Sequence, residues 1–362
     1  MYNDDKDLCC CEDYDLSNER NHILACCCNC VDLDEVVDNF IKGKRVPEHN
    51  RAGFMNTMRD RLRVPWIGGA KQVTFDSLLP IFVLPTMFTI ASFSLWWTVF
   101  SFSTVAMFHL LIFNFFIRTL PQTKFFFVWT ATSIVLLYFI FEFVVIPFLE
   151  ILVEENIALS ILIFGFIMCL YLTKLRANQL TGMCENETEY NLNGKDIAGF
   201  YNCSICDSRI PDKDHHCVWF DCCISKHNQC LFLLSLFFAI AALLYSSNLT
   251  LTSVCHPFEF FKTILLPDDC SDVYYQFELG LSFVSAIYSI LIAVCLSFIL
   301  FQQIMLISLG IPLKDWNKLS IMSKLCLGLN TNRPHNRGII KNWSRIMCQN
   351  TPKYMSVMNR DV

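Results

Sequence analysis

Charged residues are scarce in this chain of 362 residues: Asp, Glu, Lys and Arg make up 17%, whereas 54% of the residues are hydrophobic. So few charges do not cover the surface of a soluble domain, and the apolar excess therefore requires lipid. An excess of positive charge is also missing, because the formal net charge is -5. This balance excludes nucleic acid as the main partner, since a phosphate-binding face is basic.

A signal peptide is also missing. The first forty residues are acidic and rich in cysteine, and they contain no basic segment followed by an apolar core. We therefore expect the first membrane helix to direct targeting. The sequence shows no internal repeats and no low-complexity linker, so its long hydrophobic runs define its organisation.

These runs predict an all-α integral membrane protein with six transmembrane helices. The apolar run from Leu78 to Ile117 has about twice the length that one helix needs to cross a bilayer. It is predicted to form helices at 78–98 and 101–118, joined by a turn near Ser101. Four further helices are predicted at 125–149, 157–172, 230–245 and 279–307.

Basic residues orient these helices. Arg59, Arg61, Arg63 and Lys71 precede the first helix, and Lys or Arg residues also follow the second, fourth and sixth helices. Because cytosolic loops carry the excess of Lys and Arg, both chain termini and the segment 174–228 are predicted to be cytosolic. The predicted regions are an N-terminal cysteine-rich region (1–76), helices one to four (77–174), a cytosolic cysteine-rich module (175–228), helices five and six (229–310) with a lumenal loop (246–278), and a cytosolic tail (311–362).

This orientation separates the twenty cysteines into two groups. Most face the reducing cytosol, where metal or thiolate chemistry is favoured over disulfides. Only Cys255 and Cys270 are predicted to be lumenal, where they can pair. For the N-terminal cysteines (Cys9 to Cys11, Cys26 to Cys28 and Cys30) three interpretations stay open: acylation sites, a second metal site with His22, or surface thiols.

A metal site is predicted in the cysteine-rich module. Cys203 and Cys206 have the two-residue gap that presents two thiolates to one tetrahedral ion. His216 and Cys223 are expected to supply the third and fourth ligands, with Cys222 as an alternative to Cys223. A zinc ion held by four protein ligands is structural and adds folding free energy to a segment that has little core.

A nucleophile is predicted beside this site. Asp214, His215 and Cys217 are not needed by the metal. A thiol requires a base or a positive neighbour to ionise at cytosolic pH, and His215 fits this role with Asp214 orienting its ring. Because a membrane helix begins soon after Asn228, the thiolate is expected at the bilayer surface, where a long acyl chain can remain in lipid-like surroundings.

The run Asp-His-His-Cys from Asp214 to Cys217 resembles the DHHC protein acyltransferase family. It is followed by Val-Trp, by a Cys six residues later, and by Asn228 before a membrane helix. The resemblance implies that Cys217 accepts an acyl group from acyl-CoA, most simply palmitoyl-CoA, and passes it to a cysteine of a membrane-associated protein substrate. It also implies zinc binding, a role for Trp219 at the mouth of the acyl cavity, and residence in the Golgi or endoplasmic reticulum membrane.

The sequence departs from the family pattern in three places. The family module holds two zinc ions, but the upstream Cys-x-x-Cys and its His are missing here, and Arg209 replaces the last Cys of that site. One structural ion is therefore expected. The motifs that follow helices four and six are replaced by Asn178-Gln-Leu-Thr-Gly and Ile311-Pro-Leu-Lys, which predicts weaker packing of the module against the helices.

Other functional classes make different predictions. A catalytically weak or inactive membrane adaptor would bind zinc without forming an acyl-enzyme. A transporter or channel would need several polar side chains at midplane, where only His109 and Glu142 qualify, and a neutral, hydrogen-bonded side chain explains each of these. The C-terminal Asp-Val is a weak signal for a PDZ-domain partner.

Overall fold

The computed structural model describes residues 8–14, 20–23, 38–39, 41–42, 62–73, 75–119, 123–149, 151–190, 200–203, 205–206, 208–260, 264–319, 324 and 336–347. The chain divides into two compact units, residues 1–82 and 83–362. Cys26 to Cys28, Cys30 and the C-terminal Asp-Val, for which roles were predicted, lie outside the described residues.

The N-terminal unit contains two small antiparallel hairpins. Strand β1 (Glu12–Tyr14) pairs with β2 (Arg20–His22), and β3 (Arg63–Val64) pairs with β4 (Lys71–Gln72). An ion pair between Arg63 and Asp13, with 2.7 Å between Nε and Oδ2, connects the two hairpins. Both side chains are nearly buried, which strengthens an ion pair relative to one at the surface.

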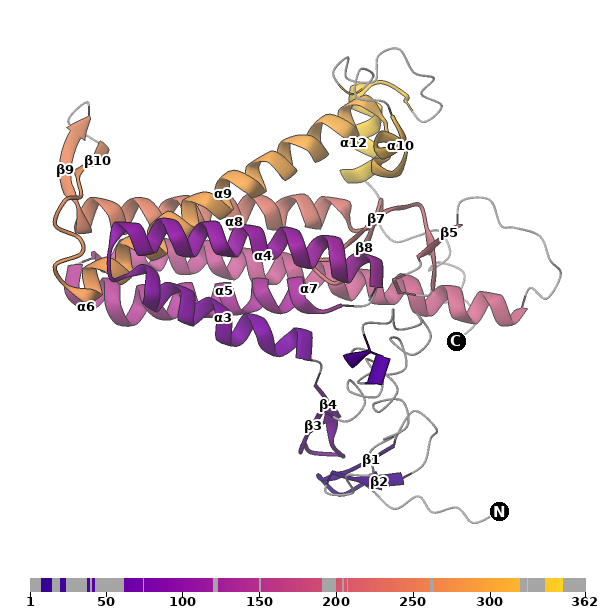
Figure 1. Cartoon of the computed structure of the whole chain (residues 1–362). Helices are drawn as coiled ribbons and strands as arrows, with labels where there is room; N and C mark the ends of the chain where they lie inside the picture. Colours follow the sequence, from indigo (N-terminus) through magenta and orange to yellow (C-terminus); the bar gives the residue numbers. More distant parts are fainter. Residues whose placement is uncertain are drawn as a thin grey trace. The chain divides into compact units, whose positions relative to one another are not determined.

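Long helices make up most of the second unit (Figure 1). Among the described residues, five helices are long and apolar enough to cross a membrane, and a shorter apolar helix covers Asp76–Ala91. The chain is thus a multi-pass membrane protein, with five such helices and a shorter one where six were predicted. The shorter helix is α3 (Phe75–Ala91). The five long ones are α4 (Leu95–Thr119), α5 continued by η1 and α6 (Phe125–Ile140, Phe141–Val145, Ile146–Leu149), α7 (Val153–Tyr190), α8 (Gln229–Val254) and α9 (Phe277–Leu309).

The turn between the first two helices lies at residues 92–94, so the predicted turn near Ser101 is wrong. Three interactions fix it: Ser92 donates to the Phe88 carbonyl, the Ser94 hydroxyl accepts from the Trp97 amide, and Thr98 donates to the Ala91 carbonyl. The turn also contacts α9, where a Cβ atom added at Gly280 would lie 2.5 Å from the Ser92 carbonyl oxygen. Serine hydroxyls that replace the missing helical hydrogen bonds explain the position of this turn.

Helix α7 continues to Tyr190, well beyond the end at residue 172 that hydrophobicity predicted. The polar sequence Asn178-Gln-Leu-Thr-Gly contains no proline, so nothing removes a backbone donor there. The Thr181 hydroxyl donates to the Asn178 carbonyl within the helix. The first part of the predicted cytosolic loop is therefore helical.

A disulfide between Cys255 and Cys270 confirms the predicted pairing of these two cysteines. It closes the hairpin of β9 (His256–Phe260) and β10 (Ile264–Asp269) at one end of the helices (Figure 1). Helix α8 extends to Val254, so the first part of the predicted lumenal loop 246–278 is helical.

The opposite end of the helices carries two more hairpins and the C-terminal helices (Figure 1). Strand β5 (Phe200–Cys203) pairs with β6 (Ser208–Pro211), and β7 (Lys213–Cys217) pairs with β8 (Cys222–Ser225). Short α10 (Leu313–Lys318) follows α9. Helix α12 (Ile339–Met347) is tied to the end of α9, because Asn342 donates to the Ser308 carbonyl and Trp343 donates to the Ser308 hydroxyl.

Candidate active site and metal centre

The register of β7 and β8 separates two groups of side chains. His216 lies opposite Cys223, and Cys217 lies opposite Cys222. Directly opposed residues in an antiparallel pair share a face, and successive residues alternate between faces. His216 and Cys223 therefore point to one side of the hairpin, while Cys217 and Cys222 point to the other.

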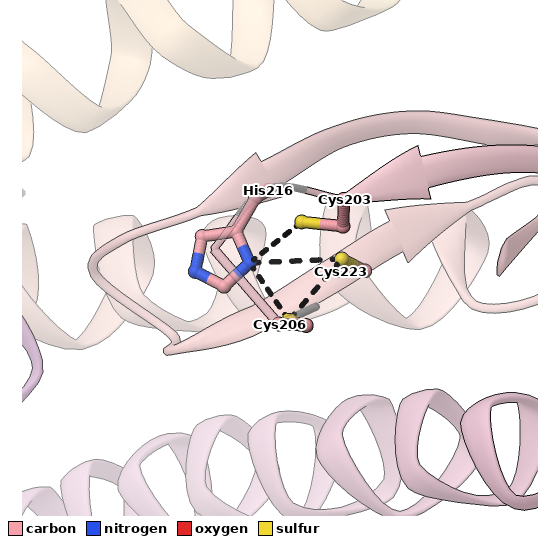
Figure 2. A group of neighbouring side chains, drawn as sticks. All are labelled: Cys203, Cys206, His216 and Cys223. Carbon is pink, nitrogen blue, oxygen red and sulfur yellow. Dashed lines mark hydrogen bonds between the residues drawn. The ribbon is translucent and has the colours of Figure 1, made fainter. Parts of the chain in front are cut away.

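The first side carries the four predicted metal ligands. The ligand atoms of Cys203, Cys206, His216 and Cys223 all lie within 4.8 Å of one another. Figure 2 shows the three sulfurs grouped around the His216 ring. The His216 Nδ1 atom is 3.8, 3.3 and 3.6 Å from the sulfurs of Cys203, Cys206 and Cys223, and the Cys206 and Cys223 sulfurs are 3.6 Å apart.

These distances match a tetrahedral zinc ion. With zinc–sulfur bonds of about 2.3 Å and zinc–nitrogen bonds of about 2.0 Å, two sulfurs lie about 3.8 Å apart, and a sulfur and a nitrogen about 3.5 Å apart. Hairpin β5–β6 brings Cys203 and Cys206 to this point without the second family site, and Arg209 lies exposed on β6. The four side chains therefore fit one zinc ion.

Cys222 does not belong to this cluster. It is 4% exposed and belongs to an apolar cluster with Cys217, Phe220 and Phe232. Burial raises the pKa of its thiol to about 12, so it stays protonated. The structure thus favours Cys223 over Cys222, the alternative that the sequence left open.

The second side of the hairpin carries Asp214, His215 and Cys217. A register shift between Lys213 and His215 marks a bulge in β7 at Asp214. A bulge re-aims side chains, so Asp214 can meet its own neighbour. Its Oδ2 atom lies 2.9 Å from Nδ1 of His215, and the two side chains are 12% and 18% exposed.

His215 is held as a proton carrier next to Cys217. Burial alone lowers the pKa of His215, but hydrogen bonds to Asp214 and Cys217 outweigh this and raise the pKa to about 9. The imidazolium that forms when His215 takes a proton from the sulfur is therefore stabilised. Since Asp214 occupies Nδ1, we infer that Nε2 faces Cys217.

A cavity of about 380 Å³ opens at Cys217. Side chains from α5, α7, α8 and α9 and from the β7–β8 hairpin line it, and most of them are apolar. Six of the apolar ones are Phe166, Phe220, Phe232, Leu236, Ala239 and Leu296. Its volume lies in the range of small-molecule sites, and its apolar walls suit a hydrocarbon chain.

Trp219 lines this cavity, and its side chain is 37% exposed. Its ring contacts Phe126 at 4.9 Å and stacks on His109 at 6.2 Å, measured between centroids. The His109 Nδ1 atom lies 2.9 Å from the Val105 carbonyl oxygen of the same helix. His109 thus has a packing role behind Trp219, which agrees with its predicted hydrogen-bonded state, and Glu142 similarly accepts a long hydrogen bond from Asn156 at 3.4 Å.

Asn228 positions the hairpin against the helices, a role that sequence reasoning missed. The side chain is fully buried. Its oxygen accepts from the Ser225 amide, and its amide group donates to the carbonyls of Thr173 in α7 and Cys223 in β8. A polar residue directly before an apolar helix was the available signal.

Comparisons with known proteins agree with this geometry. The model of the family described as DHHC palmitoyltransferase matches residues 197–319. Palmitoyltransferase ZDHHC23 of Rattus norvegicus is 25% identical over 93% of this chain and 92% of its own length. Palmitoyltransferase ZDHHC23-B of Danio rerio is 28% identical over 95% of this chain and 93% of its own length. Residues 197–319 thus match the DHHC palmitoyltransferase family, and most of the chain is similar to these two palmitoyltransferases.

Proposed function

We propose that this chain is a protein S-palmitoyltransferase in which Cys217 carries the acyl group from palmitoyl-CoA to a cysteine of a substrate protein. One observation carries the proposal: Cys217 and His215 line an apolar cavity of about 380 Å³, which the three proposed zinc-binding cysteines do not line. A site that only binds zinc needs no such cavity.

In the first half-reaction, His215 takes the proton of the Cys217 thiol, and the sulfur attacks the thioester carbonyl carbon of palmitoyl-CoA. The bond between that carbon and the CoA sulfur breaks, and the CoA thiolate takes the proton back from His215. In the second half, a thiol of the substrate protein gives its proton to His215 and attacks the acyl-enzyme. Cys217 leaves as a thiolate and is reprotonated by His215.

Asp214 holds His215 throughout this cycle. Its carboxylate fixes Nδ1 and stabilises the imidazolium that forms in each half-reaction. Zinc on Cys203, Cys206, His216 and Cys223 would supply structural rigidity. Because His216 adjoins both His215 and Cys217, the ligands on one face of the hairpin fix the reacting side chains on the other.

The membrane location supports the choice of substrates. The hairpin is joined directly to α8, which begins at Gln229, so Cys217 lies where the bilayer surface is expected. We propose that both termini and the hairpin face the cytosol and that the substrates are membrane-associated proteins with accessible cysteines. Location in the Golgi or endoplasmic reticulum membrane is part of this proposal.

The test is CoA release from palmitoyl-CoA by purified, detergent-solubilised protein. We expect release by the unsubstituted chain and none above background by Cys217→Ser. Cys230→Ser, which removes a half-buried thiol outside the cavity and the metal cluster, is the matched control and should stay active. Equal background release from unsubstituted chain and Cys217→Ser, with zinc still bound, would instead support a non-catalytic adaptor.

A further inference from the structure

The N-terminal unit contains a second group of thiols that the acyl transfer does not use. Cys9, Cys10 and Cys11 are consecutive, and their sulfurs all lie within 4.8 Å of one another. The sulfurs of Cys10 and Cys11 are 3.8 Å apart. Successive side chains in an extended strand point to opposite faces, so this convergence requires a special backbone.

A turn provides the backbone conformation that brings the three sulfurs together. The Glu12 amide donates to the Cys9 carbonyl at 3.0 Å, which closes a four-residue turn with Cys10 and Cys11 at its centre. The Glu12 carboxylate in return accepts from the Cys9 amide at 2.9 Å. The turn thus folds the three sulfurs to one side.

Two other segments of the chain hold the turn in place. The Trp66 amide donates to the Cys10 carbonyl at 3.2 Å, and the Ile23 amide donates to the Cys11 carbonyl at 2.9 Å. The sulfur positions are therefore set by backbone hydrogen bonds from both hairpins. Such a site is organised before any ligand arrives, which lowers the entropy that binding would cost.

The sulfur spacing and the surroundings point to a metal. With metal–sulfur bonds of about 2.3 Å, sulfurs on one ion lie about 3.8 to 4.0 Å apart. Cys9 and Cys10 are exposed and Cys11 is half-buried, so an ion can reach them. Among the described residues before α3, only Asp13, Gly69 and Ala70 are buried, and a unit with so small a core gains folding free energy from a bound ion.

We propose that Cys9, Cys10 and Cys11 form a three-thiolate site for a thiophilic, closed-shell metal ion, zinc or copper(I), separate from the cluster of Cys203, Cys206, His216 and Cys223. Three soft sulfur donors select such ions over magnesium or calcium. The site does not depend on the proposed acyl transfer, and both can be tested on the same protein.

The first experiment counts metal ions in the full-length protein, purified under reducing conditions, after separate incubation with Zn²⁺ or Cu⁺ and removal of free ion. After incubation with the metal that the N-terminal site prefers, elemental analysis should find two metal ions per chain, one for each site. The triple variant Cys9→Ser, Cys10→Ser, Cys11→Ser should lose one of them. Cys206→Ser should lose the other, and Cys295→Ser, which removes an exposed thiol in α9, should lose none. An unchanged count in the triple variant would overturn the proposal.

A second measurement needs no substitution. Mass spectrometry of the N-terminal peptide after alkylation should show Cys9, Cys10 and Cys11 protected in the metal-loaded protein and modified once a chelator is added. Rapid alkylation irrespective of the chelator would overturn the metal site. So would an acyl mass on these residues in the purified protein, which would assign them instead as acylation sites.

Discussion

The backbone amide of Leu313 donates a hydrogen bond of 2.9 Å to Oδ1 of Asp214, ninety-nine residues earlier in the chain. The other carboxylate oxygen of Asp214 contacts His215, so the segment after α9 orients the base of the proposed nucleophile. The departure at Ile311-Pro-Leu-Lys predicted weaker packing at this place. A backbone donor requires no particular side chain, which explains how the contact persists without the family motif.

Replacement of Asp214 by Asn is expected to slow CoA release by roughly 100-fold, in the range that one positioned acid–base partner contributes. The amide keeps an acceptor for Leu313 but no longer stabilises the imidazolium of His215. Single-turnover CoA release measures the effect. Asp221→Asn is the control, because Asp221 has only a partly exposed contact of 3.8 Å with Lys174 and a positive φ that Asn tolerates. Equal rates for the two variants would contradict the role of Asp214.

Replacement of Cys206 by Ser is expected to remove the zinc ion of the module and to abolish CoA release. Binding of structural zinc contributes on the order of 10 kcal/mol to the folding of small zinc domains, so the module should unfold locally without it. Elemental analysis and thermal unfolding measure both effects. Cys222→Ser should keep its zinc and lose only about 1 to 3 kcal/mol of stability, the cost of burying a hydroxyl. Zinc loss in Cys222→Ser would reverse the assignment of the fourth ligand.

Replacement of Asn228 by Ala is expected to destabilise the module by about 3 kcal/mol or more, because three buried backbone groups lose their partner and each costs about 1 to 3 kcal/mol. Thermal unfolding in detergent measures the change, and CoA release should fall with it. Asn178 of α7 provides the control, since its side chain is exposed and does not line the cavity. A melting temperature that Asn228→Ala leaves unchanged would exclude this positioning role.

Replacement of Ala242 by Phe is expected to shorten the acyl cavity. Ala242 lines its wall thirteen residues into α8, about 20 Å from the start of the helix at 1.5 Å per residue. CoA release from palmitoyl-CoA should fall at least tenfold, while release from decanoyl-CoA should persist. Leu244→Phe, on the exposed side of the same helix, should leave both unchanged. Equal losses for both donors would mean that the cavity does not hold the far end of the chain.

Reduction of the Cys255–Cys270 disulfide should destabilise the β9–β10 end of the protein by roughly 3 kcal/mol, as estimated for a closed loop of about 15 residues. The predicted orientation adds a further expectation. In sealed vesicles with the cytosolic face outward, an impermeant thiol reagent added after reduction should label these two cysteines only when the membrane is permeabilised. Labelling of these cysteines in intact vesicles would show that the orientation is opposite to the predicted one.

The side chains of the site were more predictable than the ends of the helices. The gap between Cys203 and Cys206 and the order of His215, His216 and Cys217 are local features, and the structure brings the proposed ligands and reacting groups together. The choice between Cys222 and Cys223 depended on a strand register that a short sequence does not determine. Leu313 and Asn228 act through contacts between distant segments. The sequence marks Asn228 as a polar residue before an apolar helix, but it does not show which groups either residue contacts.

The predicted helix boundaries were wrong where the end of a hydrophobic run does not coincide with the end of a helix. Hydrophobicity continues through residues 92–94, so the turn there depends on serine hydroxyls rather than on a loss of apolar residues. In α7 the opposite holds, because the helix continues after its hydrophobicity ends. Hydropathy indicates which residues contact lipid. A helix, in contrast, ends where proline or a competing side chain interrupts its backbone hydrogen bonds.

The contact of Gly280 with the Ser92 carbonyl has a consequence for biosynthesis. The chain is made from its N-terminus, and Gly280 is added about 190 residues after Ser92. The Tyr274 hydroxyl that hydrogen-bonds to Thr98 at 2.8 Å is also made late. The first helical hairpin therefore lacks these contacts until α9 has been synthesised. The packing of α9 against it is thus the step that completes assembly of the membrane helices.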